Sequence, residues 1–426
     1  MDELPDVPGT QGSLRRVVFY TPGWPPGNPP NGIVTYVDNL RRGLRTQGVE
    51  SHVIPYEVAP GPLGADITPL PSDRSAFLGR RIFESALRRL AGPRPISVQL
   101  GRRVGRVLGS LHRRWPFDLF EVEESFGFSA VASRFIPAPT LVRLHGPWFL
   151  NGKALGIAED QTFRNRVAQE GRAIQLALAV SSPSQDVLRQ TCAHYGFEPA
   201  HSAVIPNPGP DLPRERSWTL SGADRNAILF VGRFDRHKGG DVMIDAFQRV
   251  ARILPEARLF FAGPDRGLRD DSGRAWTLPD FLNDRFPDAA TRSRVRVLGM
   301  QTPEAIADLR RQCLVSVVPS RYENLPMTVI EAMAYGCPLV ATNSGGIAEL
   351  VRDGVNARLF PSADAESLAA VLVETMKNPE ASARLGESAR RDYEQRLAPG
   401  PVVERMMGFY QEVLARARSA GAPARP

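Results

Sequence analysis

Two series of alternating strand and helix patterns, separated by a proline-rich segment, constrain the fold of this chain more strongly than any other feature. Short apolar segments bounded by turn residues predict strands, and the amphipathic stretches between them predict helices. Such alternation is typical of parallel sheets covered by helices, so we predict an α/β protein. The predicted strands lie near residues 15–20, 49–56, 118–122, 140–144, 179–182 and 203–206 in the first series, and near residues 227–231, 258–262, 295–298, 314–318 and 338–342 in the second.

The length of the chain also predicts two domains, because 426 residues are too many for one ordinary hydrophobic core. Residues 206–213 hold four prolines in eight positions, a composition typical of a connection between domains. The sequence therefore predicts an N-terminal domain over residues 1–208 and a C-terminal domain over residues 209–396. Residues 397–426 are predicted to form a last helix and a disordered tail.

The composition is that of a globular protein without an export signal or a membrane span. Hydrophobic residues make up 42% of the chain, the start of the chain has no basic-then-apolar leader, and no apolar run reaches the roughly eighteen residues of a membrane-spanning helix. The three cysteines form no CxxC pair, which argues against a zinc site or a disulfide framework. We therefore expect a soluble, cytoplasmic protein.

The excess positive charge is concentrated in one segment. The formal net charge is +7, and ten arginines against one acid lie between Arg80 and Arg114. An arginine-rich amphipathic segment can bind an anionic membrane surface or an acidic acceptor, whereas a solvated helix face is the simpler alternative. Aromatic residues that would stack on bases are nearly absent from the segment, so nucleic acid is not expected as a partner. Peripheral contact with the inner face of a membrane is one expectation.

Two glutamates eight positions apart mark the most distinctive stretch of the second series. Glu323 follows the apolar strand pattern, and Glu331 lies about one and a half turns into a helix predicted to end at Gly336. Loops at the carboxyl ends of parallel strands bind ligands, so Glu323 is a candidate site residue. Glu331 lies in an apolar helix and needs a polar partner, either the ribose diol of a ligand or a structural hydrogen bond.

Basic residues follow the first strand of the same series. The strand at residues 227–231 runs into a glycine-containing turn that carries Arg233 and Lys238, and Lys238 is one of only three lysines in the chain. A guanidinium and an ammonium at one site suit a pyrophosphate. Unpaired N–H groups at the helix start near Asn324 and Leu325 would add partial positive charge. The pattern predicts a diphosphate site, with a charged surface turn as the alternative.

The first domain offers fewer candidate residues. Gly32 precedes a helix, where its backbone N–H could approach an anion or where a glycine simply starts the helix. His145 ends a strand, a position that fits either an active site or a structural histidine. The acidic run from Glu121 to Glu124 is expected at the surface of a strand end, and we predict no metal site.

Together these residues resemble a known family. The stretch ENLPMTVIEAMAYGCPLVAT at residues 323–342, preceded by VGRFDRHKGG at 231–240 and followed by NSGGIAEL at 343–350, strongly resembles the retaining family 4 glycosyltransferases of the GT-B fold. The specific resemblance covers residues 227–360. It implies two facing Rossmann-like domains with a cleft between them. The second domain would bind a nucleotide sugar, the first would bind the acceptor, and the last helix would cross back to the first domain.

The resemblance implies roles for charged residues of the second domain. The family pattern places Arg233 and Lys238 on the diphosphate of the donor. It places Glu331 on the ribose hydroxyls and Glu323 near the hydroxyls of the transferred sugar. Arg233, Lys238 and Glu323 are thus candidate catalytic residues.

Backbone positions and the first domain complete the implied site. The helix start at Asn324 and Leu325 would contact the diphosphate, and the backbone at residues 299–300, which are Gly299 and Met300, would line the base pocket. Gly32 matches a loop glycine that approaches the diphosphate, although the family usually has a glycine pair where this chain has Asn-Gly. His145 matches a histidine near the sugar and the acceptor, which makes it a fourth candidate catalytic residue.

By this resemblance the protein is a retaining, metal-independent glycosyltransferase that needs no cofactor besides its nucleotide-sugar co-substrate. It would move a hexose from a UDP-sugar, or next from GDP-mannose, to a hydroxyl acceptor that could be lipid-linked, in glycan, glycolipid or glycoconjugate biosynthesis. A GT-B epimerase or phosphorylase and a non-catalytic nucleotide-sugar-binding protein are the alternatives. A phosphorylase would need a cofactor lysine in the second domain, where only Lys238 and Lys377 are available.

Overall fold

The first half of the chain forms one parallel sheet. The computed structural model describes residues 14–26, 31–71, 96–270 and 272–419. The sheet has six strands in the order β2-β1-β3-β4-β5-β6, and every neighbouring pair runs parallel. Its strands are β1 (Arg16–Trp24), β2 (Glu50–Val58), β3 (Leu119–Glu123), β4 (Thr140–Arg143), β5 (Ala179–Ser182) and β6 (Ser202–Val204).

The second half forms another six-stranded parallel sheet, in the order β11-β8-β7-β12-β13-β14. Successive strands are added on one side of β7 and then on the other, so the order switches between β7 and β12. Sheets of this kind bind ligands at the carboxyl ends of the strands beside such a switch. The strands are β7 (Asp224–Val231), β8 (Arg258–Ala262), β11 (Val295–Gly299), β12 (Cys313–Val318), β13 (Leu339–Thr342) and β14 (Arg358–Phe360).

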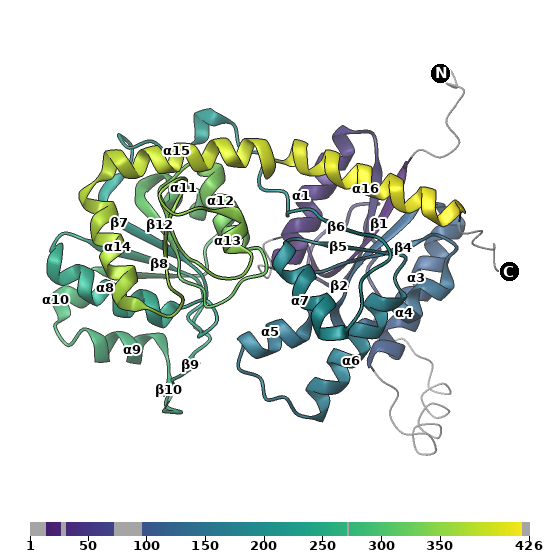
Figure 1. Ribbon diagram of the computed structural model, residues 1–426, viewed down its shortest axis with the longest axis horizontal. Coiled ribbons are helices and arrows are strands. Elements are labelled where there is room, and N and C mark those ends of the chain that lie inside the picture. Colours follow the sequence, from purple (N-terminus) through teal and green to yellow (C-terminus); the bar gives the residue numbers. More distant parts are fainter. Residues whose placement is uncertain (1–13, 27–30, 72–95, 271, 420–426) are drawn as a thin grey trace.

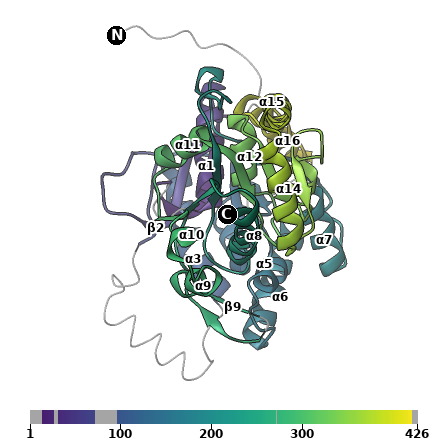
Figure 2. The same ribbon diagram turned by 90° about the vertical axis from the view of Figure 1, so that its left-hand side faces the viewer.

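Helices pack around both sheets, as the two perpendicular views show (Figure 1, Figure 2). In the first domain they are α1 (Gly32–Thr46), α3 (Ile96–Arg114), α4 (Ser129–Ala132), α5 (Trp148–Ala154), α6 (Gln161–Leu176) and α7 (Gln185–Tyr195). In the second they are α8 (Gly240–Ile253), α9 (Leu278–Arg285), α10 (Ala289–Arg292), α11 (Pro303–Gln312), α12 (Met327–Tyr335), α13 (Ile347–Leu350), α14 (Ala365–Lys377) and α15 (Pro379–Arg396), followed by α16 (Pro399–Ser419). Short 3₁₀ turns are η2 (Ser125–Gly127), η3 (Ser133–Phe135) and η4 (Arg214–Arg216).

The structure confirms the predicted α/β architecture of two domains. Each predicted strand is present with small shifts of its ends. The sequence did not predict β14 or the hairpin of β9 (Leu268–Arg269) and β10 (Ala275–Trp276), because two or three residues are too few to show a period of two. The boundaries at residues 208 and 396 remain predictions.

The helix that carries Glu331 has the ends its sequence predicted. Pro326 is the N-cap of α12, and Gly336 closes its C-terminus with φ of +70°, in the left-handed region that favours glycine. Six of its residues, including Val329 and Met333, are buried in the core of the second domain. Apolar packing on nearly all sides therefore fixes the position of α12 beside β12 and β13.

The last helix returns to the first domain, as the resemblance implied. Helices α15 and α16 follow each other along one side of the molecule, from the second domain to the first (Figure 1). The apolar face of α16 belongs to the same buried cluster as β1 and α1. The hydroxyls of Tyr36 in α1 and Tyr410 in α16 both donate to the buried carboxylate of Glu121, at 2.8 and 2.6 Å. Helix α16 is thus an integral part of the core of the first domain.

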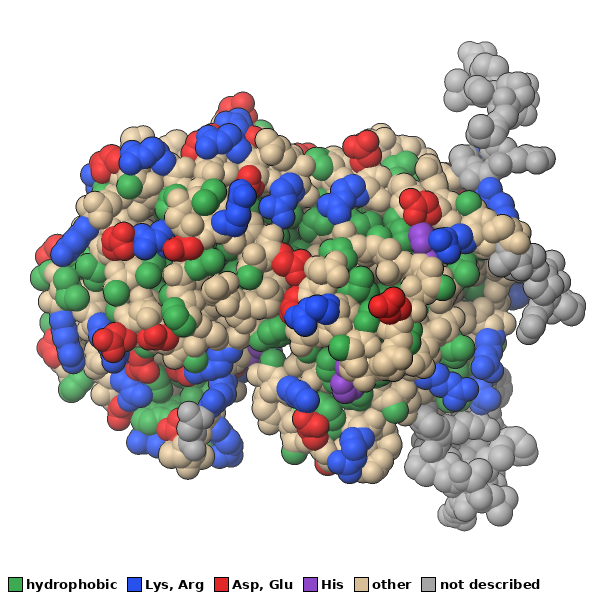
Figure 3. All heavy atoms as spheres, in the orientation of Figure 1, with side chains coloured by type: hydrophobic (Ala, Val, Ile, Leu, Met, Phe, Trp, Pro, Cys, Tyr) green, Lys and Arg blue, Asp and Glu red, His purple; other side chains and the backbone are tan. Residues whose placement is uncertain are grey.

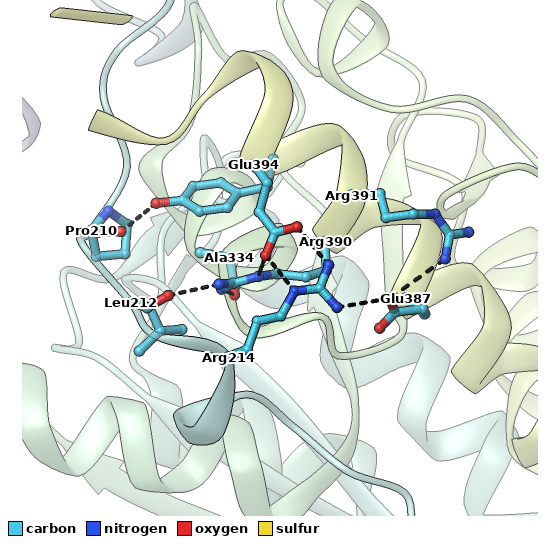
Figure 4. Close-up of polar contacts among 9 residues, drawn as sticks. Pro210, Leu212, Arg214, Ala334, Glu387, Arg390, Arg391 and Glu394 are labelled. Carbon is cyan, nitrogen blue, oxygen red and sulfur yellow. Dashed lines mark hydrogen bonds and ion pairs between the residues drawn. The ribbon is translucent and has the colours of Figure 1, made fainter. Parts of the chain in front are cut away.

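The proline-rich connection is anchored to α15 of the second domain (Figure 4). Tyr393 donates to the carbonyl oxygen of Pro210, and Arg390 donates to that of Leu212 at 2.6 Å. The backbone N–H of Gly209 also donates to the carbonyl oxygen of Leu397, at 2.8 Å. Because Leu397 lies between α15 and α16, the two chain crossings between the domains lie side by side.

The arginine-rich segment is described only in part, because residues 80–95 lie outside the described residues, as does the predicted disordered tail at residues 420–426. Within α3, leucines and valines pack inward, whereas Arg102, Arg106, Arg113 and Arg114 are exposed. The described part therefore has the solvated basic face that the sequence left as one alternative. None of the helices in the described ranges has the length and hydropathy needed to cross a bilayer.

Candidate active site

The loops that follow β7 and β12 meet at the switch point of the second sheet. Because these strands are hydrogen-bonded neighbours, their carboxyl ends lie side by side. The ammonium of Lys238, in the first loop, donates to Oε1 of Glu323, in the second. The two side chains are 24% and 9% exposed, so the ion pair is largely shielded from solvent. The structure thus brings together two residues that the sequence assigned to one site.

A carboxylate within the first loop holds two of its cationic residues, Arg233 and Lys238, in place. Asp235 accepts a 2.6 Å hydrogen bond from Nε of Arg233 and a 2.7 Å hydrogen bond from the backbone N–H of Lys238. Gly239 then turns the chain into α8 with φ of +70°, and a Cβ there would lie 2.0 Å from the carbonyl oxygen of Pro319. Glycine is required for this close approach. The residue type at 239 therefore determines how closely the loop lies against the end of β12.

The charge of Glu323 follows from its surroundings. Burial raises the pKa of this carboxyl group, but the ammonium of Lys238 and the ring of His237 outweigh it, so the pKa of Glu323 is lowered. Burial lowers the pKa of His237, whose Nδ1 has no hydrogen-bond partner among the described residues. At neutral pH the site therefore presents an ionised carboxylate beside a neutral imidazole.

A second ion pair ties the two loops together. The guanidinium of Arg321 binds the carboxylate of Asp241 through two hydrogen bonds of 2.9 and 2.7 Å. The backbone N–H of Arg321 donates to the carbonyl oxygen of His237 at 2.9 Å. Asp241 lies in the first turn of α8, so this contact fixes the start of α8 relative to the loop after β12. The loops are held as one unit, which limits how far Lys238 and Glu323 can move apart.

Glu331 has the structural partner that the sequence left open. Nη2 of Arg310, in α11, donates to Oε2 of Glu331 at 2.8 Å. Arg310 is only 1% exposed, whereas the side chain of Glu331 is 30% exposed. The carboxylate is therefore paired on its inner side and open to solvent on its outer side. The sequence analysis did not identify Arg310. A glutamate in an apolar helix needs a polar partner, and this was the feature that could have pointed to a buried arginine.

The start of α12 lies against a loop containing a glycine pair. The N-cap residue Pro326 makes no side-chain hydrogen bond to the helix start. The backbone N–H of Gly346 donates to the carbonyl oxygen of Glu323 at 2.8 Å, and a Cβ at Gly346 would lie 1.9 Å from the carbonyl oxygen of Asn324. Leu325 is buried in the core, at 7% exposure. The backbone around residues 323–326 is thus fixed by packing from both sides.

On the first domain, the loop after β4 places His145 toward the second domain. Its backbone N–H donates to both carboxylate oxygens of Glu124, at 3.1 and 2.9 Å. Its ring packs edge-on against Tyr36, with 5.0 Å between the ring centroids. Burial and the positive charge of Arg143 lower the pKa of His145 well below its ordinary value. The imidazole of His145 is therefore neutral at physiological pH.

The predicted surface position of the acidic run at the end of β3 is wrong. Glu121, Glu123 and Glu124 are 2%, 6% and 1% exposed, because every residue of β3, the third strand from the edge, is buried. Burial raises the pKa of Glu123 to about 7 and that of Glu124 to about 8. The alternation of polar and apolar residues predicted that these glutamate side chains are exposed to solvent. In the structure they instead face hydrogen-bond donors inside the domain.

The remaining predicted residues are a glycine at the start of a helix, and a glycine with an exposed methionine at the end of a strand. Gly32 begins α1, where Asn31 accepts the N–H of Ile33 at 2.8 Å, and a Cβ on Gly32 would meet nothing within 4 Å. Gly299 ends β11 with φ of +66°, and Met300 after it is 54% exposed. The sheet order places these two residues two strands away from β7, along the same edge as Lys238.

One contact that the sequence did not predict joins the two domains at this site. The side-chain amide of Asn324, next to Glu323, donates to the carbonyl oxygen of His145 at 2.8 Å. A notch opens between the two domains along one edge of the molecule (Figure 3). Among the described residues, no group of three or more His, Cys, Asp or Glu side chains has a metal-binding arrangement.

Known proteins match both halves of the chain. The profile described as Glycosyltransferase Family 4 matches residues 30–208, and that described as Glycosyl transferases group 1 matches residues 213–392. A D-inositol 3-phosphate glycosyltransferase from Nocardiopsis dassonvillei is 30% identical over 268 residues, which are 61% of this chain and 62% of that protein. The match thus spans less than two thirds of the length of this relative.

Solved structures show the same fold. A sucrose-phosphate synthase from Thermosynechococcus elongatus has a TM-score of 0.68 and 19% sequence identity, and the match covers 94% of this chain and 100% of that one. HepE from Anabaena, in complex with UDP, has a TM-score of 0.65 and 17% identity with the same coverage. The two profiles together cover both sheets and the residues of the site. The chain therefore belongs to the family 4 glycosyltransferases of the GT-B fold.

Proposed function

We propose that this protein is a retaining glycosyltransferase that moves a hexose from a nucleoside-diphosphate sugar to a hydroxyl acceptor. The observation that carries the proposal is the convergence of Arg233, Lys238, Glu323 and the N-terminus of α12 at the carboxyl ends of β7 and β12. Membership in a family of glycosyltransferases supports it.

The positive groups fit the charge that develops when a nucleoside diphosphate departs. In the transfer, the bond between the anomeric carbon and the β-phosphate oxygen breaks, and the acceptor oxygen bonds to the anomeric carbon from the same face. The departing phosphate accepts the proton of the acceptor hydroxyl. Arg233, Lys238 and the N–H groups of α12 would stabilise the negative charge on that phosphate. In this proposal these groups take the role that a divalent metal has in other transferases.

Glu323 and His145 would contact the sugar from opposite domains. The lowered pKa of Glu323 keeps its carboxylate ionised, so it would accept hydrogen bonds from sugar hydroxyls and favour positive charge on the sugar. The lowered pKa of His145 keeps its ring neutral, so it would position hydroxyl groups without adding a charge. Neither role requires a covalent sugar intermediate.

A UDP-sugar is the donor we propose first. Structures of the related fold in Anabaena HepE are in complex with UDP and with UDP-glucose, which makes uridine nucleotides the first donors to test, followed by GDP-mannose. Glu331 would accept the ribose hydroxyls through the open side of its carboxylate. Gly32 and the backbone near Leu325 would contact the diphosphate, and Gly299 with Met300 would line the base.

Turnover of nucleotide sugars tests the proposal. We expect one sugar nucleotide of a UDP and GDP panel to raise the melting temperature and to be consumed with release of the nucleoside diphosphate. Lys238→Ala and Glu323→Ala should lower that rate at least about a hundredfold, whereas Lys153→Ala, which removes another lysine of a Lys–Glu pair, should not. Wild-type rates in both site variants would overturn the assignment.

Two further measurements test the mechanism, and the products of the reaction separate the alternatives. Retention requires that the product has the anomeric configuration of the donor, which proton NMR of the anomeric signal reports. Metal independence requires turnover that survives chelation with EDTA. An epimerase would convert the nucleotide sugar into its epimer without transferring the sugar to an acceptor. A phosphorylase would need phosphate as acceptor, and a binding protein would bind the nucleotide sugar without consuming it.

The proposed role of Glu331 has its own test. Glu331→Gln keeps an oxygen that can accept from Arg310 but loses the charge that strengthens hydrogen bonds from ribose hydroxyls. We expect KM for the donor to rise about tenfold with little change in kcat. An unchanged KM would assign Glu331 to the structural ion pair with Arg310 alone.

A peripheral membrane contact is a proposal for the basic face of α3. Arg102, Arg106 and Arg113 are exposed on this helix, and anionic lipids attract such clusters. Co-sedimentation with phosphatidylserine vesicles should occur at low salt and collapse at high salt, and it should weaken in a variant with these three arginines changed to glutamine. Absence of binding, or binding that salt does not change, would contradict the contact and leave the transferase proposal intact.

A further inference from the structure

Both chain neighbours of Glu323 are hydrogen-bonded to the opposite domain. On one side, the hydroxyl of Tyr322 donates to Oδ2 of Asp186, in α7 of the first domain, at 3.1 Å. On the other side, Asn324 donates to the carbonyl oxygen of His145, also in the first domain. Glu323 itself is paired with Lys238 inside the second domain. Glu323, which the proposed reaction uses, therefore lies in the chain directly between two residues that contact the first domain.

The contact of Asn324 is directional and closely packed. Its Nδ2 donates both to the carbonyl oxygen of His145 and, at 3.0 Å, to Oδ1 of Asn151. Asn151 in turn donates from Nδ2 to the carbonyl oxygen of Gly146 at 2.7 Å, which fixes the orientation of both amides. Gly146 has φ of +129°, and a Cβ there would lie 2.1 Å from Nδ2 of Asn324. Glycine at 146 thus leaves the space that lets the second domain reach the backbone of His145.

The contact of Tyr322 belongs to a second bridge. Gln190, one turn further along α7, donates to the hydroxyl of Tyr322 at 3.1 Å. Glu349, in α13 of the second domain, accepts the backbone N–H groups of Gln185 and Asp186 at 2.8 and 2.7 Å. A carboxylate of one domain thereby caps the N-terminus of a helix in the other, where negative charge is favoured. These contacts set the position of α7 against the loop that carries Glu323.

We propose that Asn324 and Tyr322 are positioning residues, which hold the loop of Glu323 against the loop of His145 through their hydrogen bonds to the carbonyl oxygen of His145 and to Asp186. This inference rests on the proposed function. His145 and Glu323 lie on different domains, and within the described residues the chain crosses between the domains only near residues 209 and 397. The covalent connections are thus far along the chain from both residues.

The physical reason is the precision that such a site needs. Reacting groups must be held within about half an ångström, and a displacement of about 1 Å can cost a hundredfold in rate. A hinge of two adjacent chain segments cannot hold that precision alone. The direct hydrogen bond from Asn324 to the backbone of His145 fixes the separation of the two loops at the site itself, and Tyr322 fixes their rotation through α7.

Enzyme kinetics of matched variants tests the inference. Asn324→Ala and Tyr322→Phe each remove one cross-domain contact, and Asn226→Ala and Tyr56→Phe are the controls, because both residues are exposed and neither lies at this interface. The probe is UDP-glucose, or whichever nucleotide sugar of the panel the wild-type protein consumes. We expect kcat to fall about tenfold in Asn324→Ala and about threefold in Tyr322→Phe. KM should stay within about twofold, because most of the proposed donor-binding residues belong to the second domain.

A double-mutant cycle separates positioning from a general structural role. If Asn324 acts through His145, then Asn324→Ala should cost less than about twofold in kcat once His145→Ala has removed the imidazole. Additive losses in the cycle would overturn the inference, as would a kcat equal to that of the controls. Both outcomes leave the transferase assignment standing, because they concern only these variants.

Small-angle scattering gives a readout that does not depend on turnover. The double variant Asn324→Ala/Tyr322→Phe should have a larger radius of gyration than the wild-type protein, whereas the double control Asn226→Ala/Tyr56→Phe should match it. If the wild-type protein consumes no nucleotide sugar, the proposed function fails while this expansion still supports the cross-domain contacts. An unchanged radius in the double variant would overturn the inference whatever the activity.

Discussion

The ammonium of Lys238 and the carboxylate of Glu323 form an ion pair between loops whose residues lie 85 positions apart in the chain. The pair lies at the switch point between β7 and β12, where the geometry of the sheet brings the two loops together. Each side chain compensates for the burial of the other. Removing one of them should therefore affect the stability of the protein as well as its activity. The effect on stability should depend on pH.

Lys238→Met should destabilise the protein by about 3 kcal/mol at pH 7, because it leaves the carboxylate of Glu323 buried without its partner. In the wild-type protein the pKa of Glu323 is lowered, so its stabilising contribution is present above the unfolded value of 4.5 and is lost as the pH falls through the folded pKa. The difference between wild type and variant should thus shrink from pH 7 to pH 4. Chemical denaturation at several pH values measures it.

The matched control is Lys153→Met. Lys153 pairs with Glu159 at 3.4 Å, and both side chains are 55% exposed, so the loss should be below about 0.5 kcal/mol. Equal losses for the two lysines, or a loss at Lys238 that does not depend on pH, would show that the buried pair does not stabilise the fold as described.

Gly239→Ala should misplace the cationic loop. A Cβ at this position would lie 2.0 Å from the carbonyl oxygen of Pro319, so the backbone must move in addition to bearing left-handed strain. Gly354 has nearly the same φ, +69°, but a Cβ there meets nothing within 4 Å, so Gly354→Ala measures the strain alone. We expect about 1 kcal/mol of destabilisation at 354, about 2 kcal/mol more at 239, and a large loss of turnover only at 239. Equal losses of stability and turnover in the two variants would contradict the close approach of residue 239 to the carbonyl oxygen of Pro319.

The buried carboxyl group of Glu124 should make stability fall as the pH rises. Burial raises its pKa from 4.5 to about 8, so its contribution is fully present below the unfolded value and is lost as the pH rises through the folded value. Glu124→Gln removes this titration but keeps an oxygen that can accept the N–H of His145. Between pH 5 and 8 the variant should therefore show a flatter stability profile than the wild type, measured by thermal unfolding. Glu198→Gln, at an exposed position, should leave the slope unchanged; a wild-type slope in Glu124→Gln would refute the assignment.

Tyr410→Phe should loosen the last helix. The variant removes the 2.6 Å hydrogen bond that the hydroxyl of Tyr410 donates to the buried carboxylate of Glu121. Of the two tyrosine hydroxyls that donate to this carboxylate, only that of Tyr36 then remains. A buried acceptor that loses a donor costs about 1–3 kcal/mol. We expect faster amide exchange in α16 and a lower melting temperature, with Tyr56→Phe at an exposed position as the control. Unchanged exchange in α16 would mean that its apolar face alone holds it to the first domain.

Much of the site could be predicted from the sequence because its parts are local. The loop from Arg233 to Gly239 follows a strand, and Glu323 follows the neighbouring one, so the topology of a parallel sheet was enough to bring them to one edge. The limits of α12 were also readable, because Gly336 ends the helix and its neighbours are apolar. The roles of all the predicted site residues, Gly32, Gly299 and Met300 among them, stay predictions.

The burial of the carboxylates after β3 could not be read in the same way. Polar residues at a strand end usually indicate solvent, and only the packing of Tyr36 and Tyr410 around Glu121 shows otherwise. Tyr410 is 289 positions away from Glu121 in the chain, so no local pattern records the contact. The pairing of Arg310 with Glu331 is another case, because it joins two helices whose relative position depends on the core.

The sequence by itself therefore determined the class of the fold, the order of its elements and the charged groups at the switch point of the second sheet. These depend on hydrophobic periodicity, helix ends and turn residues, which act over a few positions. The tertiary structure alone decided how the two domains meet, and with it that Asn324 reaches the backbone of His145 across the interface. The reason is physical: a hydrogen bond between domains depends on the relative position of two rigid bodies, which no short stretch of sequence specifies.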